Sequence, residues 1–387
     1  MTELLNNWEN GRWIGQTLEV ENGVCAVPQK MDVGDLVYDD EVKTAVDHMY
    51  DEVSDFIPKF EWPTYAPLVH AINKLKKEKN AVVLAHNYMT PDIYALVGDF
   101  KGDSLGLAIE ATKTDADIIV QAGVHFMAET SKILCPDKKV LISSLDAGCS
   151  LASSITGDDM RLIKQKYPGI PVVTYVNTTA DVKAETDICC TSSNAVQVVE
   201  HIAKEWGVTK VIMAPDEFLA KNVANMTGIE VVAWHGRCEV HARFNAQDII
   251  EMRERWPGVV VLAHPECPPE VVAESDFTGS TKAMTDYVSN NKPKNVVLLT
   301  ECSMSDNVAM ANPDVDFVRP CNLCPHMKRI TLQNIYECLR DEKHEVKVSK
   351  RIAKKAKHAV QRMIDLPAPG VKGHFDPKAA HKDIKVI

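Results

Sequence analysis

A threefold internal repeat constrains the fold of this chain more than any other sequence feature. Three segments share one order of patterns: a run of aliphatic and β-branched residues, a polar triplet, a helical stretch, and a short run that ends in Ser or Thr. The triplets are His86-Asn87-Tyr88, Tyr175-Val176-Asn177 and His264-Pro265-Glu266. Self-similarity of this kind is typical of one supersecondary unit used several times. The chain is therefore predicted to contain three related units.

The second half of each unit repeats as well and ends in a cysteine. A further β-branched run is followed by a helical stretch and then by the endings LISSLDAGC, VVAWHGRC and FVRPCNLC. The first triplet residue precedes the cysteine by 63 residues in the first unit (86 to 149), 63 in the second (175 to 238) and 60 in the third (264 to 324). This spacing selects Cys149, Cys238 and Cys324 from the eleven cysteines of the chain.

Alternating strands and helices predict an α/β fold with parallel sheets and right-handed crossovers. We expect three homologous αβα, Rossmann-like units around a pseudo-threefold axis. The active site should lie at the centre, because ligands of such sheets gather beyond the carboxyl ends of the strands. The expected boundaries are 1–65 for an N-terminal extension, 66–153, 154–242 and 243–328 for the three units, and 329–387 for a C-terminal helical segment and tail. The alternative is a set of independent βα units whose strand-end polar residues only cap helices.

The segment from Ser349 to Leu366 predicts an amphipathic helix. Its apolar positions fall on one stripe, which comprises Ile352, Ala356, Ala359, Val360, Met363 and Ile364. Pro367 and Gly370 then indicate a loose tail.

Charge and hydropathy exclude two classes of partner. The net charge of the 387 residues is −11, from 43 basic and 54 acidic residues, which argues against a broad nucleic-acid surface. No apolar run approaches the roughly 18 residues of a membrane span. The first 28 residues lack an apolar segment after a basic start, so no signal peptide is expected. We predict a cytoplasmic protein that binds neither nucleic acid nor membrane.

Eleven cysteines in a reducing compartment favour metal or redox use over disulfides. Cys189 and Cys190 lie in an apolar run, where core packing is the simpler interpretation. Three thiolates from three strand ends suit either zinc or an iron–sulfur cluster. A [4Fe–4S] cluster with three protein thiolates keeps one iron open as a Lewis acid. Cys321 is the rival of Cys324 within a CxxC pair, and the repeat spacing favours Cys324.

Several motifs together resemble the quinolinate synthase family. They are AHNYMTPDIY, FMAETSKIL, AGCSLA, TYVNTTADVKAETD, TSSNAV, APDEFLA, WHGRCEVH, HPECPPEV, GST and CPHMK, in the order of the family, from about Val82 to Val348. The chain departs from the family at two points. Ala220 stands where Gly is frequent, and Cys324 is preceded by a CxxC where some members have a longer cysteine run.

The resemblance implies a reaction and a cofactor. Members of the family condense iminoaspartate with dihydroxyacetone phosphate to give quinolinate, phosphate and water for NAD synthesis. They carry one [4Fe–4S] cluster per chain, held by the positions that match Cys149, Cys238 and Cys324. The family also implies L-aspartate oxidase as the functional supplier of iminoaspartate.

The predicted site residues follow from the triplets, the Ser/Thr turns and the family. The turns, where helices begin, suit the anionic substrate groups, with helix capping as the competing role. The candidates for substrate binding are His86, Ser104, Tyr175, Asn177, Ser192, His264, Glu266, Ser280 and Thr281. By resemblance, Glu266 and Tyr88 are the foremost catalytic candidates, joined by His86, Tyr175 and His241 as groups able to transfer protons. His241 follows Cys238 by three residues, so one helical turn would bring it near the cluster.

Three other functions remain open from the sequence. Another open-iron hydro-lyase acting on a different small carboxylate would hold the same cluster. An iron–sulfur carrier or redox sensor would need an exposed cluster and no elaborate pocket. A zinc enzyme would use the same three thiolates.

Overall fold

The computed structural model describes residues 8–9, 12–13, 36–320, 322–367, 376 and 382–387. Cys321 and Gly370 lie outside the described residues. The three predicted units are present, and each holds a four-stranded parallel core with one common strand order. Within each unit, the second strand in the chain pairs with the first, the first with the third, and the third with the fourth. The predicted α/β fold class is therefore confirmed.

Each unit contributes its four strands in the same sequence of crossovers. In the first unit they are β3 (Ala81–His86), β4 (Phe100–Gly102), β5 (Ile118–Ala122) and β6 (Lys139–Ile142). In the second they are β7 (Val172–Tyr175), β8 (Ile188–Cys190), β9 (Lys210–Ala214) and β10 (Glu230–Ala233). In the third they are β11 (Val260–Ala263), β12 (Phe277–Thr278), β13 (Asn295–Leu299) and β14 (Asp316–Val318).

Helices connect the strands and cover the sheets. The crossover helices of the first unit are α3 (Pro91–Leu96), α4 (Ser104–Lys113) and α5 (His125–Leu134). Those of the second are α8 (Ala180–Lys183), α9 (Ala195–Trp206) and α10 (Glu217–Met226). Those of the third are α12 (Pro269–Glu274), α13 (Thr281–Asn291) and α14 (Ser303–Met310). A further helix precedes the first strand of each unit: α2 (Trp62–Glu78), α7 (Gly157–Lys166) and α11 (Ala246–Arg255).

The remaining elements flank the three units. Before them come the short strands β1 (Trp8–Glu9) and β2 (Arg12–Trp13), helix α1 (Asp40–Val46) and a 3₁₀ turn, Asp47–Glu52. Short helical turns follow the three selected cysteines: α6 (Ser150–Ser153), η2 (His241–Arg243) and η3 (Met327–Arg329). After the third unit come α15 (Leu332–Asp341), α16 (Lys350–Asp365) and β15 (Lys385–Val386). No described helix is both long and apolar enough to cross a bilayer.

The strands are buried because helices cover both faces of the parallel sheets. All five residues of β5 are buried, and so are those of β7 and β8. Such strands read as continuous apolar runs rather than as alternating patterns. Cys189 and Cys190 belong to β8 and have no exposed surface, as the core-packing interpretation predicted.

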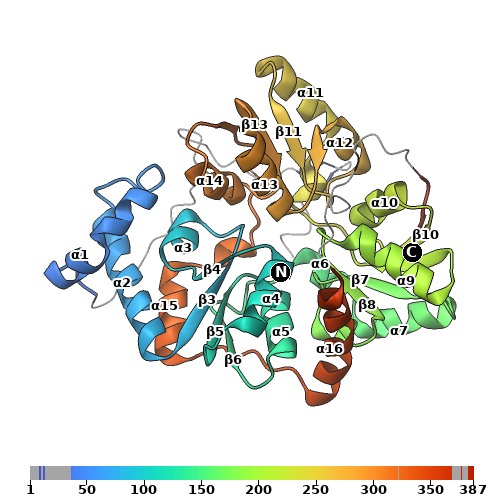
Figure 1. The fold of residues 1–387 in the computed structure, drawn as a ribbon, viewed down its shortest axis with the longest axis horizontal. Coiled ribbons are helices and arrows are strands. Elements are labelled where there is room, and N and C mark those ends of the chain that lie inside the picture. Colours follow the sequence, from blue (N-terminus) through green and yellow to red (C-terminus); the bar gives the residue numbers. More distant parts are fainter. Residues whose placement is uncertain (1–7, 10–11, 14–35, 321, 368–375, 377–381) are drawn as a thin grey trace.

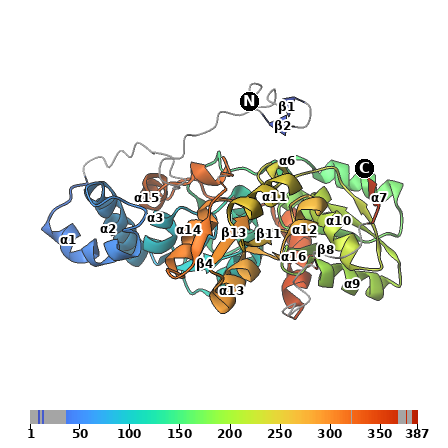
Figure 2. The same ribbon diagram turned by 90° about the horizontal axis from the view of Figure 1, so that it is seen from above.

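The three units surround a common centre (Figure 1). The first unit, the second and the third form three lobes, and the connections after their strands run toward the middle. Seen edge-on, the lobes stand next to each other rather than stacked (Figure 2). Because the carboxyl ends of all these strands face the middle, polar residues from three distant parts of the chain meet there.

The last helices pack back onto the first two units. Helix α15 contacts α2 and β6 of the first unit, and α16 contacts α5 of the first unit and α8 of the second. The predicted amphipathic helix is confirmed as α16, which Ser349 caps and which buries Ala356, Ala359, Val360 and Met363. The expectation of a loose tail is wrong for Lys385 and Val386. These residues form β15, which extends the second sheet in parallel beside β10, because β10 otherwise leaves an open edge.

Candidate active site

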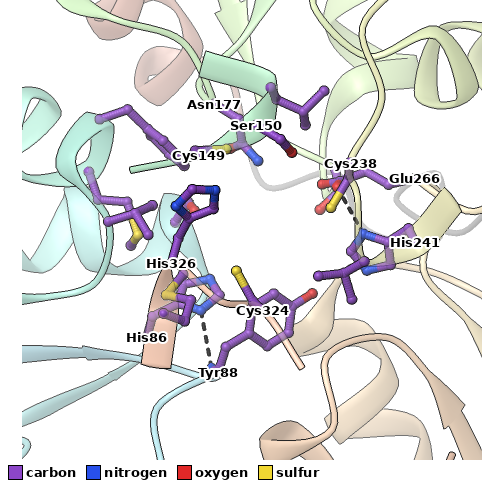
Figure 3. A pocket seen from close by; sticks show the side chains of 18 of the residues that line it. His86, Tyr88, Cys149, Ser150, Asn177, Cys238, His241, Glu266, Cys324 and His326 are labelled. Carbon is purple, nitrogen blue, oxygen red and sulfur yellow. Dashed lines mark hydrogen bonds and ion pairs between the residues drawn. The ribbon is translucent and has the colours of Figure 1, made fainter. Parts of the chain in front are cut away.

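The three selected cysteines line one central cavity (Figure 3). Cys149 follows β6, Cys238 follows β10 and Cys324 follows β14, and their sulfur atoms point into the shared space. Of the nine cysteines in the described part of the chain, these three are partly exposed and the other six are buried. The cavity has an empty volume of about 730 Å³, a figure that includes space open to solvent.

The chain leaves each cysteine in the same way. Beyond the short helical turn, each is followed seven residues later by the residue that caps the next long helix: Thr156 after Cys149, Asn245 after Cys238 and Thr331 after Cys324. All three caps are capping boxes, in which the cap and the third helical residue bond to each other's backbone N–H. Cys321 has no such relation to a cap. This second periodicity supports Cys324 as the third repeat cysteine.

Backbone amides face each of the three sulfur atoms. The N–H groups of Ala152, His241 and Met327, each three residues after its cysteine, are directed at the sulfur atoms of Cys149, Cys238 and Cys324. Such amides stabilise thiolates, and hydrogen bonds to sulfur are one of the ways in which proteins tune iron–sulfur clusters.

The thiols are nevertheless held protonated by their surroundings. Desolvation in the enclosed cavity raises the pKa of Cys149 and of Cys324 to about 12, and that of Cys238 well above its usual range. Negative charge on Cys324 further raises the pKa of Cys149, and negative charge on Cys149 or Cys324 further raises that of Cys238. A metal centre with positive charge between them would lower these pKa values, because positive charge stabilises the thiolate form in which cysteine binds metals.

The spacing of the thiols fits a cluster better than one ion. Within the described residues, the one group of three donor atoms that lie within 4.8 Å of one another is Cys238, His241 and Glu266. The three sulfur atoms do not form such a group. A single zinc ion with bonds of about 2.3 Å would require sulfur atoms about 3.8 Å apart. A larger body such as a [4Fe–4S] cluster tolerates wider separation, so the donor set fits it.

A buried ion pair fixes the loop that carries Cys324. Glu301 follows β13 and is fully buried, and its carboxylate accepts the backbone N–H of Cys324 at 3.4 Å. The ammonium of Lys328 lies 3.0 Å from the same carboxylate and also donates to the backbone oxygen of Tyr88 at 3.3 Å. The pair therefore ties the third cysteine loop to the first triplet.

A continuous chain of hydrogen bonds runs along the cavity wall. The Tyr175 hydroxyl donates to Glu266 Oε1 at 2.5 Å, and Glu266 Oε2 lies 3.0 Å from His241 Nδ1. His241 Nε2 lies 2.9 Å from Thr300 Oγ1, which is 2.5 Å from the Tyr88 hydroxyl. The chain thus joins two phenols through a carboxylate and an imidazole, so a proton can move between distant parts of the cavity.

Burial and neighbouring charges determine the protonation states of Glu266, Tyr88 and Tyr175 in this network. Desolvation opposes charge on Glu266, but His241, His264 and the Tyr175 hydroxyl outweigh it and lower the pKa of this carboxyl. Desolvation, assisted by the charge of Glu266, raises the pKa of Tyr88 and of Tyr175 well above the usual value. Glu266 is therefore ionised and the two phenols are protonated, so the carboxylate accepts hydrogen bonds and the phenols donate them.

The two histidines of the triplets, His86 and His264, are neutral. Burial lowers the pKa of His86 to about 4 and that of His264 to about 3. His86 Nδ1 accepts the backbone N–H of Tyr88 at 3.1 Å, and the ring of His264 stacks on that of His241 with centroids 4.6 Å apart. Both histidines line the cavity.

The predicted anion-binding residues divide into two groups. Ser104, Asn177, Ser192 and Thr281 line the cavity. Ser104 and Thr281 are the first residues of α4 and α13, and the cap of α4 is Asp103 rather than Ser104. Ser280 caps α13 by accepting the N–H of Ala283 and is not part of the cavity lining. The competing role of helix capping therefore applies to Ser280.

Sequence reasoning missed several residues of the site. Thr300 completes the hydrogen-bond chain, Glu301 holds the Cys324 loop, and Ser150 and His326 line the cavity. Thr300 and Glu301 come directly after β13, the third strand of the third unit. The strand-end rule that selected the triplets would have found both, had it been applied to third strands as well. His326 lies two residues after Cys324 and pairs with Glu239 at 3.1 Å.

Comparison with known proteins now decides the family. The family model described as Quinolinate synthetase A protein matches residues 70–365. The chain is 62% identical to the quinolinate synthase of Caulobacter vibrioides over 353 residues, 91% of this chain and 96% of the relative. It is 61% identical to quinolinate synthase 1 of Mesorhizobium japonicum, over 82% of this chain and 96% of the relative. The chain belongs to the quinolinate synthase family.

Membership of the quinolinate synthase family makes this chain an enzyme of NAD biosynthesis. One sequence departure from the family is mild in structural terms. Ala220, which stands where Gly is frequent, is fully buried inside α10 and does not line the cavity. Alanine favours a helix interior over glycine, so the change suits its position.

The neutral state of His86 predicts an acid-sensitive contribution to stability. Its folded pKa of about 4 lies below the ordinary value of 6.5, so the unfolded chain binds a proton between these limits while the folded chain does not. The contribution is present above pH 6.5 and is lost as the pH falls toward 4. Against a His86→Asn variant, cluster-free wild type should lose about 1.4 kcal/mol of unfolding free energy per pH unit in this window.

Anaerobic urea denaturation from pH 7.5 to 4.5 measures this difference. Asparagine can still accept the N–H of Tyr88, so the variant keeps the local hydrogen bond. His201→Asn, at a position on α9 where the side chain is 44% exposed, is the matched control and should follow the wild-type curve. Parallel curves for wild type and His86→Asn would contradict the neutral assignment.

Proposed function

We propose that this chain condenses iminoaspartate with dihydroxyacetone phosphate to give quinolinate, phosphate and water, with a [4Fe–4S] cluster held by Cys149, Cys238 and Cys324. The observation that carries the proposal is the convergence of three repeat cysteines and the hydrogen-bond chain on one cavity. When bound, the cluster would supply an iron without a protein ligand, which acts as a Lewis acid in dehydration.

The cavity wall offers groups for the charged parts of the substrates. The first turns of α4 and α13 direct backbone N–H groups and the hydroxyls of Ser104 and Thr281 toward carboxylate or phosphate oxygens. Asn177 Oδ1 is buried and makes no hydrogen bond within the described residues. We assign it to an N–H of the substrate, because a buried acceptor without a partner is costly.

The hydrogen-bond chain supplies the proton transfers. Glu266 accepts a proton during dehydration, and His241 and Thr300 connect it to Tyr88 at the other side of the cavity. Tyr175 donates to Glu266 and, together with the neutral His86, is assigned to the carbonyl isomerisation. His264 orients the network by stacking on His241. L-aspartate oxidase is the proposed supplier of iminoaspartate.

Of two other functions, one agrees less well with the cavity and the other would need the same cluster. An iron–sulfur carrier needs no acid–base network, whereas this wall joins two tyrosines through Glu266 and His241. A hydro-lyase acting on another small carboxylate would use the same cluster, so spectroscopy does not separate it from a quinolinate synthase.

The substrates themselves separate these functions. Anaerobically purified protein with a full cluster should form quinolinate from iminoaspartate and dihydroxyacetone phosphate, measured by chromatography and mass. Omission of either substrate is the control. A cluster-replete sample that forms no quinolinate would exclude the proposed reaction, while turnover of a different carboxylate would support the hydro-lyase.

A further inference from the structure

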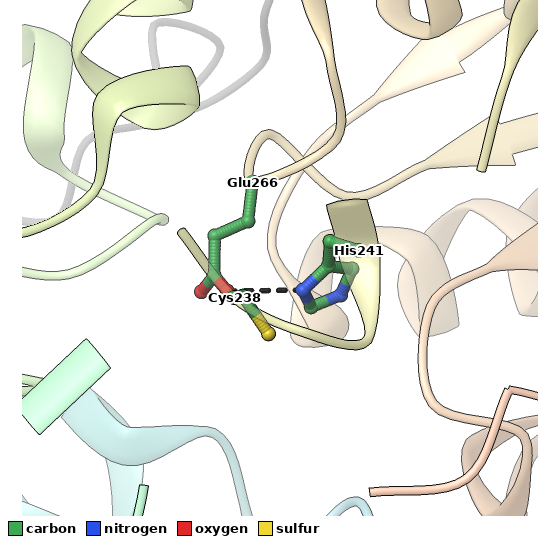
Figure 4. A group of neighbouring side chains, drawn as sticks. All are labelled: Cys238, His241 and Glu266. Carbon is green, nitrogen blue, oxygen red and sulfur yellow. Dashed lines mark hydrogen bonds and ion pairs between the residues drawn. The ribbon is translucent and has the colours of Figure 1, made fainter. Parts of the chain in front are cut away.

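A second donor set lies within the cavity beside the three cysteines. Cys238, His241 and Glu266 bring a sulfur, a nitrogen and an oxygen atom within 4.8 Å of one another (Figure 4). Cys238 and His241 form a Cys-x-x-His pair on the turn that leads into η2, and Glu266 comes from the triplet of the third unit. This set shares only Cys238 with the three cysteines.

We propose that the cluster-free enzyme binds one zinc ion through Cys238 Sγ, His241 Nδ1 and Glu266 Oε2. Mixed sulfur, nitrogen and oxygen ligands are typical of zinc, with bonds of about 2.0–2.3 Å. Tetrahedral ligands are then about 3.3–3.8 Å apart. The His241–Glu266 contact of 3.0 Å needs only to open slightly, and the Cys238 sulfur already lies within 4.8 Å of both atoms. The fourth position opens into the cavity, as in zinc sites with three protein ligands.

Each of the three donors already has the outer partner that a zinc ligand requires. His241 Nε2 lies 2.9 Å from Thr300 Oγ1, and donation of its N–H there leaves the Nδ1 lone pair directed at the ion. Glu266 uses Oε1 to accept the Tyr175 hydroxyl, which leaves Oε2 for the ion. The sulfur of Cys238 faces the backbone N–H of His241.

Charge favours a cation at this point as well. Cys238 and Glu266 both become negative on ionisation, and they lie side by side in a desolvated part of the cavity. A zinc ion between them satisfies both charges at once. The outer partners and the charges thus point to the same position.

Zinc binding and cluster binding exclude each other, because both require Cys238. This exclusion rests on the proposed cluster, whereas the zinc site itself does not. With zinc bound, Glu266 serves as a ligand and can no longer accept a proton, so the zinc form is inactive. The set is therefore a misloading site that competes with cluster assembly for the cluster-free chain.

Zinc titration of the full-length, cluster-free protein against a chromophoric chelator tests the site. One equivalent of zinc should bind, and Cys238→Ala, His241→Ala and Glu266→Gln should each weaken binding by at least about tenfold. Cys149→Ala and Cys324→Ala are the matched controls and should bind zinc as the wild type does. Equal weakening by these two controls, or the absence of stoichiometric binding, would refute the assignment.

Two further measurements do not depend on ligand removal. Thr300→Val and Tyr175→Phe keep all three donors and should weaken zinc binding by about 10- to 100-fold through loss of the outer partners. Cobalt in place of zinc should give the thiolate-to-metal absorption of one sulfur ligand in wild type, and an intensity typical of three would overturn the site. A protein that binds zinc here but forms no quinolinate once its cluster is restored would contradict only the proposed reaction.

Discussion

Replacement of Cys149, Cys238 or Cys324 by alanine is expected to prevent cluster assembly and to reduce quinolinate formation to background. Each thiol lines the cavity, faces a backbone amide three residues later and comes from a different unit. In each variant only two protein thiolates remain, so the cluster is no longer bonded to one of the three units. Iron and sulfide analysis, the visible absorption of the cluster and the quinolinate assay together measure the effect, and all three variants should fail in each.

Two cysteine variants serve as controls for this result. Cys135→Ala changes a buried thiol of the first unit that lies outside the cavity and donates to the backbone oxygen of Ala111 at 3.2 Å. Cys321→Ala changes the other cysteine of the CxxC pair, which does not share the seven-residue spacing to a helix cap. Both variants should keep iron, sulfide and activity. A cluster that is lost with Cys321 but kept without Cys324 would reverse the assignment of the third ligand.

The second large effect is expected from Glu266→Gln, which should lower kcat by about 10²- to 10⁴-fold, the usual contribution of a general base. Glutamine keeps the shape of the side chain. Its oxygen can still accept the Tyr175 hydroxyl and its amide can donate to His241 Nδ1, so the network stays connected. What is lost is the negative charge that accepts the proton.

The cluster content and the activity should therefore separate in this variant. Its iron, sulfide and visible absorption should match wild type while turnover falls. Glu270→Gln is the matched control, because it makes the same change four residues later at an exposed position of α12. A Glu266→Gln enzyme with near-normal kcat would remove Glu266 from the acid–base machinery.

The repeat made most of the architecture predictable. Nearly equal spacing from triplet to cysteine located Cys149, Cys238 and Cys324, and parallel sheets place strand ends at one edge. The same reasoning predicted that His86, Tyr175 and Glu266 lie near one another at the centre of the molecule. Family resemblance added the reaction, which neither spacing nor composition specifies.

Other parts of the site depend on contacts that no pattern encodes. Ser280 and Thr281 are neighbours in sequence, yet one caps α13 and the other lines the cavity, because the cap fixes which hydroxyl turns back to the helix. The pair Glu301 and Lys328 joins residues 27 positions apart (301 to 328) across two loops. Such a pair is visible only after packing has brought the loops together.

The packing of α15 against α2 has a consequence for how the molecule is made. Residues 332–341 pack on residues 62–78, the helix with which the first unit begins. The first unit is synthesised first, but its outer layer is complete only after residues 332–341 have been synthesised. Contacts across some 270 positions make such closure slow compared with local folding. During that interval Cys149 is already synthesised while Cys324 is not yet in place. For the proposed cluster, the order of synthesis therefore makes delivery of iron a late event, after all three lobes have met.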